Sequence, residues 1–374
     1  MSLSTSSAKC FPSPSERGSL ILVINPGSTS TKVAVFDHSE VVFQATIRHS
    51  ADELALYSSI GEQLPFRKQL VLGQLKIAGV DLSSLQAVIG RGGLIKPVSS
   101  GVYTVNELMK EHLRSGFQGQ HASNLGGLIA ADIAELCQPG VQAFIADPVV
   151  VDELQPCARI AGHPLFERRS VFHALNQKAI ARTYARETGI PYEQLNLVVA
   201  HLGGGISVGA HCRGQVIDVN QALDGEGPLS PERSGTLPAG QLAAICFSGN
   251  YTHQEVAAMI NGKGGLTALC NSNNVQKLTI QAQAGDKNTK LILETLCYQV
   301  AKEIGAMSAA LKGKVDGIIL TGGIACNSWI TDSITQYVGF IAPVHVYSGE
   351  DEMAALSMNV QMALSGEIEV KEYR

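Results

Sequence analysis

A short loop between two apolar runs carries the first residues of this sequence that could bind a phosphate. Residues 23–37 read VINPGSTSTKVAVFD, which places Asn25, Ser28, Ser30 and Lys32 around a single glycine. A two-residue turn would be enough to join two antiparallel strands. Four successive hydroxyl side chains, at 28–31, and a lysine exceed what a turn requires, and these groups can donate hydrogen bonds to an anion. The loop therefore favours phosphate binding over a plain turn.

A second loop combines a histidine with three glycines. His201 closes an apolar run and is followed, after one leucine, by Gly203, Gly204 and Gly205. A histidine at the end of a strand is more often structural than functional. Residues without a Cβ, however, let backbone N–H groups converge on an anion. The triple glycine therefore indicates a second phosphate-binding loop.

A third glycine pair interrupts an apolar run near the C-terminus. GIILTGGIACNS at 317–328 reads as a buried strand that breaks at Gly322 and Gly323 and continues into a helix, with Asn327 close behind. The free N–H groups at the start of a helix attract anions and nucleotides. We predict a nucleotide contact at this break.

Several other charged or polar residues are candidates, and most of them have an ordinary alternative. A turn would explain the arginine between glycines at 90–93 and the Asp-Pro pair at 147–148, and packing would explain a histidine that starts a helix. An acidic helix N-terminus would explain the trio at 350–352. The candidates are Arg91, His121, Asp147, His173, Arg233, Glu350, Asp351 and Glu352.

The elements that would position these residues alternate short apolar runs with longer amphipathic stretches, which indicates an α/β fold. Helices are expected at 51–78, 104–114, 123–137, 173–188, 239–247, 253–260, 287–311 and 351–364. The segments around both phosphate loops run strand, tight turn, strand, strand. This internal echo predicts two related domains, although chance similarity between two hairpins is the alternative.

Composition excludes several classes of protein. The chain has 374 residues, 45% of them apolar and 16% charged, with a net charge of −5. These values are typical of a globular protein of two domains and argue against nucleic acid or a membrane as a partner. The eight cysteines form no C-x-x-C pair, so we expect free thiols and a cytoplasmic location. Residues 1–18, rich in serine and proline, are expected to form a disordered tail.

Seven motifs in the chain resemble those of the acetate and butyrate kinases, in the order found in that family. The family consists of carboxylate kinases of the actin/hexokinase/Hsp70-like superfamily. The motifs span residues 20 to 365: NPGSTSTK, IGRGGLIKP, FHALNQKA, AHLGGGISVGAH, PERSGTLPAG, TGGIACNS and SGEDEMAAL. GRGGLIKP departs from the acetate kinase pattern and looks closer to the butyrate kinases. Gly204 also departs, because acetate kinases usually carry asparagine there.

The resemblance implies a role for each candidate residue. Arg91, Asp147, His173 and Arg233 would be catalytic, while Asn25, Ser28, Ser30, Lys32 and His121 would surround the substrate and its phosphate. His201, Gly203, Gly204, Gly205, Gly322, Gly323 and Asn327 would bind the nucleotide. Asn25 and the acids at 350–352 would reach Mg²⁺, with Asp351 aligned to the metal-linked glutamate of the family and Glu350 and Glu352 as alternatives.

The resemblance also implies a fold and a reaction. We expect two duplicated actin-like (ribonuclease H-like) α/β domains with an active-site cleft between them, domain I at 19–155 plus 355–374 and domain II at 156–354. The expected reaction is direct in-line phosphoryl transfer from ATP to butyrate or a similar short-chain acid. Acetate or propionate as substrate, or an actin-like nucleotide-dependent scaffold, are the alternatives. The relatives form homodimers, so a homo-oligomer is expected.

Overall fold

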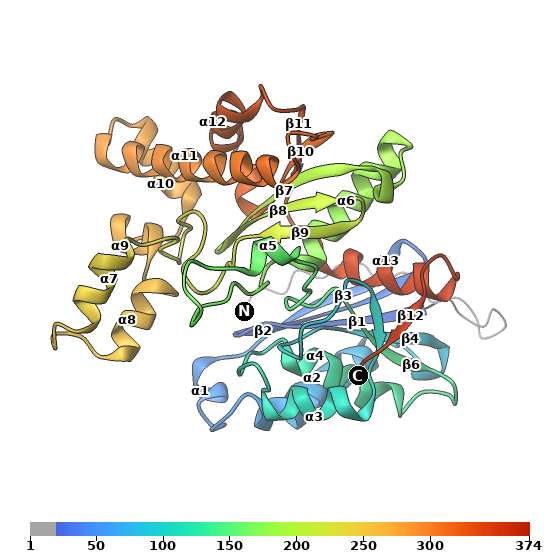
Figure 1. The fold of residues 1–374 in the computed structure, drawn as a ribbon. Coiled ribbons are helices and arrows are strands. Elements are labelled where there is room, and N and C mark those ends of the chain that lie inside the picture. The colour runs from blue at the N-terminus through green and yellow to red at the C-terminus, as the bar shows by residue number, and fades with distance from the viewer. Residues whose placement is uncertain (1–19) are drawn as a thin grey trace. The chain divides into compact units, whose positions relative to one another are not determined.

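The computed structural model describes residues 20–374, which divide into two compact units (Figure 1). Unit 1 comprises the described residues up to Val150 together with Asp351–Arg374, and unit 2 is Val151–Glu350. The sequence predicted the boundaries at 155 and 354 instead. The predicted tail at 1–18 lies outside the described residues.

Unit 1 is built on a seven-stranded mixed sheet with the order β12-β5-β6-β4-β1-β2-β3. The two hairpin strands β1 and β2 are antiparallel, β4 runs parallel to β1, and β6 runs parallel to β4. Residues in β1 and β4 are almost completely buried, as expected for strands covered on both faces. The strands are Leu20–Pro26 (β1), Ser30–Asp37 (β2), Glu40–Arg48 (β3), Leu85–Arg91 (β4), Val102–Thr104 (β5), Gln142–Ala146 (β6) and Val370–Glu372 (β12).

Unit 2 repeats this arrangement in a five-stranded sheet with the order β11-β10-β7-β8-β9. Its hairpin strands β7 and β8 are antiparallel, β10 is parallel to β7, and β11 is parallel to β10. Position for position, this is the order and direction of β6-β4-β1-β2-β3 in unit 1. The predicted duplication is therefore confirmed. The strands are Asn196–Leu202 (β7), Ile206–Cys212 (β8), Gln215–Val219 (β9), Gly317–Gly322 (β10) and Val344–Ser348 (β11).

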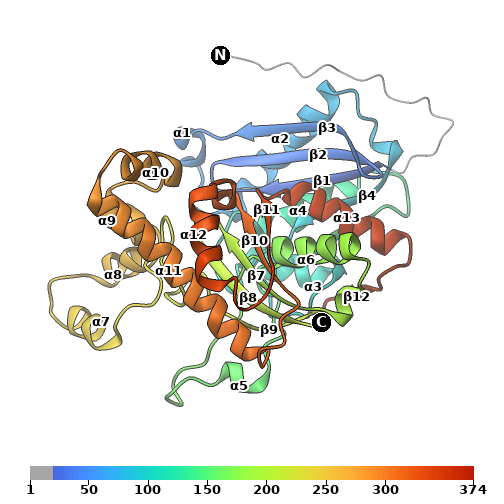
Figure 2. The same cartoon turned by 90° about the horizontal axis from the view of Figure 1, so that it is seen from above.

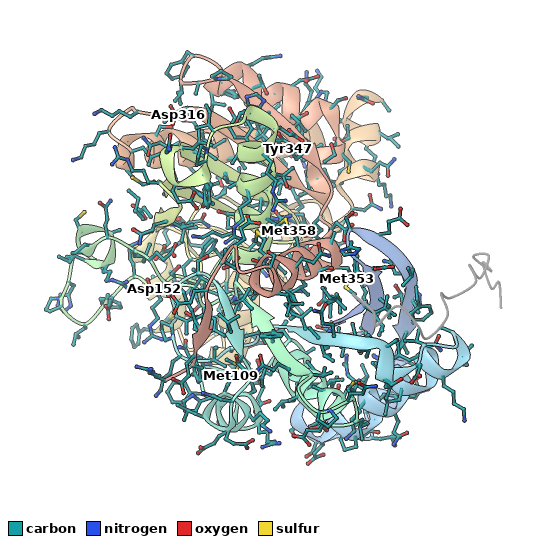
Figure 3. The ribbon with its side chains drawn as sticks, turned by 90° about the vertical axis from the view of Figure 1, so that its right-hand side faces the viewer. Met109, Asp152, Asp316, Tyr347, Met353 and Met358 are labelled. Carbon is teal, nitrogen blue, oxygen red and sulfur yellow. The ribbon has the colours of Figure 1, made fainter. Side chains whose placement is uncertain are left out.

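Helices cover both faces of the unit 1 sheet. In Figure 3 the labelled Met109 marks α3 and Met353 marks α13, which lie on opposite sides of the sheet. The predicted single helix at 51–78 is wrong: two helices form there, and Pro65 stands in the first turn of the second, where its missing N–H costs nothing. The helices are Ala51–Leu54 (α1), Leu64–Ile77 (α2), Glu107–Ser115 (α3), Asn124–Ala134 (α4) and Glu352–Leu364 (α13).

Unit 2 is layered in the same way, with α11 and α12 on one face of its sheet and α6 on the other (Figure 2). Alternate residues of β7 supply the two cores, since Val198 and Ala200 face α11 while Leu197 and Val199 face α6. The helices are Pro156–Arg159 (α5), Ala174–Thr188 (α6), Ala239–Cys246 (α7), His253–Ile260 (α8), Gly265–Cys270 (α9), Val275–Gln283 (α10), Lys287–Ala310 (α11) and Ser328–Val338 (α12). Among the described residues, none of the helices in either unit is both long and apolar enough to span a bilayer.

Candidate active site

The first predicted phosphate loop is the tip of the β1–β2 hairpin. Asn25 pairs with Lys32, and Pro26 with Thr31. Because side chains alternate between the faces of a strand, Asn25 and Lys32 share one face of the hairpin while Thr31 points to the other. The tip is closed by a 2.7 Å hydrogen bond from the N–H of Gly27 to the carbonyl of Ser30. The predicted donors Ser28 and Lys32 are exposed at this tip, and Ser30 is half-buried.

Asn25 and Arg91 converge on the carboxylate of Glu352. The Asn25 amide donates to Glu352 Oε2 over 2.6 Å. The guanidinium of Arg91 contacts both oxygens of the same carboxylate, at 3.0 and 3.1 Å. A two-pronged arginine–carboxylate contact of this kind fixes geometry as well as charge. The Nε of Arg91 has no hydrogen-bond partner among the described residues.

The three acidic residues at 350–352 contact three different partners. Asp351 caps α13 by accepting a 2.9 Å hydrogen bond from the N–H of Ala354. Glu350 belongs to unit 2 and lies 3.3 Å from Nε2 of His201. Glu352 alone is joined to Asn25. The structure therefore places Glu352, and not the aligned Asp351, beside the predicted phosphate loop.

The glycines that flank Arg91 serve packing. A Cβ on Gly90 would lie 2.0 Å from the carbonyl oxygen of Gly126, and a Cβ on Gly126 would lie 2.3 Å from the carbonyl oxygen of Arg91. Helix α4 thus rests directly on the backbone at the end of β4. Asn124, at the start of α4, accepts a hydrogen bond from the N–H of Leu94. These contacts fix the backbone from which Arg91 projects.

Asp147 occupies a turn at the end of β6. Its φ of +38° lies in the left-handed region that aspartate tolerates better than most residues, and the side chain is buried. Its carboxylate accepts hydrogen bonds from the Ser100 hydroxyl (2.6 Å) and the Gly101 N–H (2.8 Å). These contacts match the turn-forming alternative, and a part in the reaction stays a prediction.

His121 is exposed just before α4. Its Nδ1 contacts the hydroxyl of Ser123 at 2.8 Å and accepts the N–H of the same residue. These contacts fix the ring at the entrance to the helix that packs on the Arg91 strand. Contact with substrate likewise stays a prediction for this residue.

His201 holds the position in the second hairpin that Asn25 holds in the first. Each is the last residue but one of its strand, and each lies next to a glutamate of the 350–352 trio. The ring of His201 stacks on that of His173, with centroids 3.9 Å apart and planes inclined by 13°. Asn176 contacts Nδ1 of His201 at 2.7 Å, and Ser207 contacts Nδ1 of His173 at 2.8 Å. Two predicted residues from different motifs thus form one stacked pair.

Arg233 lies across the glycine loop. Its guanidinium donates to the carbonyl of Ala222 over 2.7 Å and to the side chain of Asn261 over 3.3 Å. A Cβ on Gly205 would fall 1.6 Å from Nη1 of this arginine. Burial lowers the pKa of the Arg233 guanidinium, although an arginine stays protonated near neutral pH. Gly205 is therefore required because a guanidinium occupies the space of its side chain.

The substitution Gly205→Ala is expected to displace Arg233. We expect kcat to fall by about a hundredfold, which is the loss typical when one charge-stabilising donor is misplaced. Alanine at 204 is the matched control, since its Cβ would meet only Glu232, at an ordinary 3.7 Å. Steady-state kinetics on both variants, with melting curves, measures the difference. Equal losses in the two would contradict the packing argument.

A cavity of about 760 Å³ opens beside the second loop in unit 2. Its volume falls in the range of pockets that hold a small ligand or cofactor. Four predicted nucleotide residues line it, namely Gly203, Gly204, Gly323 and Asn327, together with Glu350. Gly322 does not line it, because this glycine serves close packing: a Cβ there would lie 2.4 Å from the carbonyl oxygen of Leu202.

One wall of the cavity was missed by the sequence analysis. It comes from α10, which contributes Thr279, Ile280 and Gln283, and from the preceding asparagines. Thr279 accepts a 2.8 Å hydrogen bond from Asn327, which joins α10 to the predicted nucleotide segment. The asparagine run before an apolar stretch was the available signal, since Asn274 caps α10.

Comparison with known proteins places the chain in a family. Residues 162–341 match the model of the acetokinase family. Butyrate kinase 1 of Clostridium acetobutylicum is 54% identical over 354 residues, which cover 95% of this chain and 99% of that protein. Acetate kinase of Porphyromonas gingivalis shares the fold, with a TM-score of 0.74 at 18% identity over 92% of this chain and all of that one. The α/β fold of two related units that the sequence predicted is confirmed. The chain therefore belongs to the acetokinase family, and within it to the butyrate kinases.

Proposed function

We propose that this chain transfers the γ-phosphoryl group of ATP to the carboxylate of butyrate, giving ADP and butyryl phosphate. The observation that carries the proposal is that each unit offers a hairpin loop with unpartnered N–H groups and an arginine held close by. Among the described residues, no group accepts from the N–H of Ser28, Thr29, Gly204 or Gly205. The high identity to butyrate kinases supports the choice of acid.

The reaction needs charge neutralisation and no general base. A carboxylic acid with a pKa near ~4 is already ionised at neutral pH. One carboxylate oxygen forms a bond to the γ-phosphorus while the bond from that phosphorus to the bridging oxygen breaks, and its electron pair leaves with ADP. Two anions must therefore be held in line, which is work for positive groups and N–H donors. Asp147 is assigned the orientation of neighbouring groups and no proton transfer.

Arg91 is assigned to the substrate carboxylate. One edge of its guanidinium is fixed by Glu352, which leaves the edge that carries Nε for a second carboxylate. His121, at the start of the helix packed on the Arg91 strand, is assigned to the same substrate. The planar fork of arginine matches a carboxylate better than a lysine does.

Arg233 and His173 are assigned to the transferring phosphoryl group, with Ser28, Ser30 and Lys32 around it. His201 and Gly205 hold the nucleotide phosphates. The cavity beside Gly203 and Gly323 holds the adenosine, with Gly322 packing its edge. In the cavity, polar side chains such as Asn327 and Thr279 stand among apolar ones, as is common where a ligand must be oriented.

Mg²⁺ is assigned to Glu352 and Asn25, with Glu350 and Asp351 contributing at most through water. Among the described residues, no three His, Cys, Asp or Glu side chains are grouped to form a complete metal cage. One carboxylate and one amide oxygen fit Mg²⁺, which keeps several waters and binds substrate phosphates as well. The ion, when bound, neutralises phosphate charge.

Replacing Arg91 with alanine is expected to raise the KM for butyrate by about tenfold to a hundredfold, because a charge-assisted contact to the carboxylate is lost. The KM for ATP should change little. Initial rates at varied butyrate test this, with Arg114→Ala as a control that removes the same charge from an exposed helix of unit 1. An unchanged KM for butyrate would count against the assignment.

An assay that traps acyl phosphate with hydroxylamine, run over a series of acids, tests the function as a whole. Butyrate should give the highest kcat/KM. A preference for acetate or propionate would overturn the choice of acid. Formation of no acyl phosphate, with ATP-dependent sedimentation of a polymer, would instead support an actin-like scaffold.

We also propose that the chain forms a homodimer, which the same sedimentation run without ATP would reveal. We propose a cytosolic location as well, which the free thiols of the described cysteines support.

A further inference from the structure

The guanidinium of Arg67, on α2, contacts the backbone of the first predicted phosphate loop. The side chain is 0% exposed. Its guanidinium donates to three carbonyl oxygens of the loop, those of Gly27 at 2.7 Å, Ser28 at 3.1 Å and Ser30 at 3.3 Å. No motif in the sequence pointed to this residue.

Among the described residues, no carboxylate neutralises the charge of Arg67. Its other partners are Oγ1 of Thr31, at 3.2 Å, and Oε1 of Gln63, at 3.0 and 2.8 Å. All the acceptors that the described residues offer to this guanidinium are therefore uncharged. Burial lowers the pKa of Arg67, yet an arginine remains protonated near neutral pH. A buried cation without an anionic partner is costly, unless an anion completes the site.

The carbonyl groups and the N–H groups of the loop differ in their hydrogen-bond partners. The fourth carbonyl of the tip, that of Thr29, accepts the N–H of His49 at 2.9 Å. Every carbonyl from 27 to 30 thus accepts a hydrogen bond from Arg67 or from the N–H of His49. The N–H groups of Ser28 and Thr29, in contrast, have no partner among the described residues. Carbonyl oxygens would repel a phosphate, whereas N–H groups would bind it.

We infer that Arg67 is the positioning residue of the first phosphate loop: it holds the carbonyls away from the bound phosphoryl group and places a positive charge behind the free N–H groups. The inference rests on the proposed function, which makes the loop a phosphate site. Arg67 touches no substrate in this scheme. It acts through the backbone of residues 27–30.

The test compares Arg67→Gln with Lys68→Gln. Both remove one positive charge from α2, but Lys68 is paired with Asp132 at 2.7 Å and has no hydrogen bond to the loop among the described residues. We expect Arg67→Gln to lower kcat about a hundredfold and to raise the KM for butyryl phosphate in the reverse reaction about tenfold, as is usual when the support of a site is lost. The Kd for ADP, measured by calorimetry, should stay within about twofold. Lys68→Gln should match the unchanged chain in all three.

Several outcomes would overturn the inference. One is an Arg67→Gln variant with normal kcat and a normal KM for butyryl phosphate. Another is a loss of ADP binding in step with activity, which would indicate a general loss of folded protein. If Arg67→Gln does not fold, Arg67→Lys replaces it, with an expected tenfold loss of kcat and unchanged ADP binding, and a normal kcat would overturn the inference. An unchanged chain that forms no butyryl phosphate would refute the proposed function instead.

Discussion

Replacing Arg233 with alanine is expected to lower kcat by about a thousandfold while the Kd for ADP stays within about twofold, since an arginine on a transferring phosphoryl group contributes about 10³ to 10⁵ in rate. The side chain is already held in place by the carbonyl of Ala222 and by Asn261. Its Nη2 has no hydrogen-bond partner among the described residues, so this nitrogen is available to a phosphoryl oxygen. Little rearrangement is needed when charge develops there.

Nucleotide affinity should survive because Arg233 does not line the cavity. The neighbouring residues Pro231 and Glu232 do line it, together with Gly203 and Gly204. On the proposed assignments, loss of the guanidinium removes a contact to the γ-phosphoryl group and leaves the proposed adenosine wall intact. Calorimetry with ADP and single-turnover kinetics with ATP and butyrate separate these two effects.

Two further variants control for charge and shape. Arg213→Asn removes the same charge from an exposed turn of unit 2, where a φ of +50° suits asparagine, and should leave kcat unchanged. Arg233→Lys keeps the charge without the fork and should recover only part of the lost rate. Normal turnover in Arg233→Ala would refute the phosphoryl assignment.

Local sequence signals were enough to predict the two hairpins and their loops, but not the short strands β5 and β12. A glycine break between two apolar runs identifies a hairpin wherever it stands, so both loops and the duplication could be read from short segments. The glycines around Arg91 could also be seen in the sequence, but the packing contact that requires them could not be predicted. They allow α4 to rest on the end of β4, and this helix lies more than thirty residues further along the chain.

Arg67 shows why other parts of the candidate site could not be predicted. In the segment FRKQ, Arg67 and Lys68 are adjacent cations on one predicted helix, and nothing local separates them. The two side chains differ because successive residues of a helix point in different directions. Arg67 points toward the hairpin and is fully buried, while Lys68 points toward Asp132. Such a distinction depends on contacts between segments some forty residues apart, which propensity does not contain.

The acidic trio shows a similar limit at finer scale. Alignment by motif favoured Asp351, but aspartate is also a preferred helix cap, and the start of α13 uses it for that purpose. Once Asp351 is the cap, the next residue begins the helix. Glu352 then reaches Asn25 and Arg91.

Replacing Glu352 with glutamine is expected to lower kcat by about a hundredfold and to raise the Mg²⁺ concentration needed for half-maximal rate by at least about tenfold. The substitution keeps the size of the side chain and removes its charge. Mutation of a group that orients a metal site typically costs about 10- to 100-fold in metal affinity or activity. Rates measured across a Mg²⁺ titration at fixed free ATP test the expectation.

The same variant distinguishes metal binding from support of Arg91. If Glu352 served only to hold Arg91, the KM for butyrate would rise and the Mg²⁺ requirement would not change, and that result would contradict the metal assignment. Asp351→Asn is the matched control, because asparagine also caps helices, so the Mg²⁺ requirement should stay normal. Glu350→Gln completes the comparison. Since Glu350 contacts His201 in unit 2, its loss should alter the Kd for ADP more than the Mg²⁺ requirement. The three adjacent acids would then have different roles. Asp351 would cap α13, Glu352 would hold the metal, and Glu350 would affect nucleotide binding.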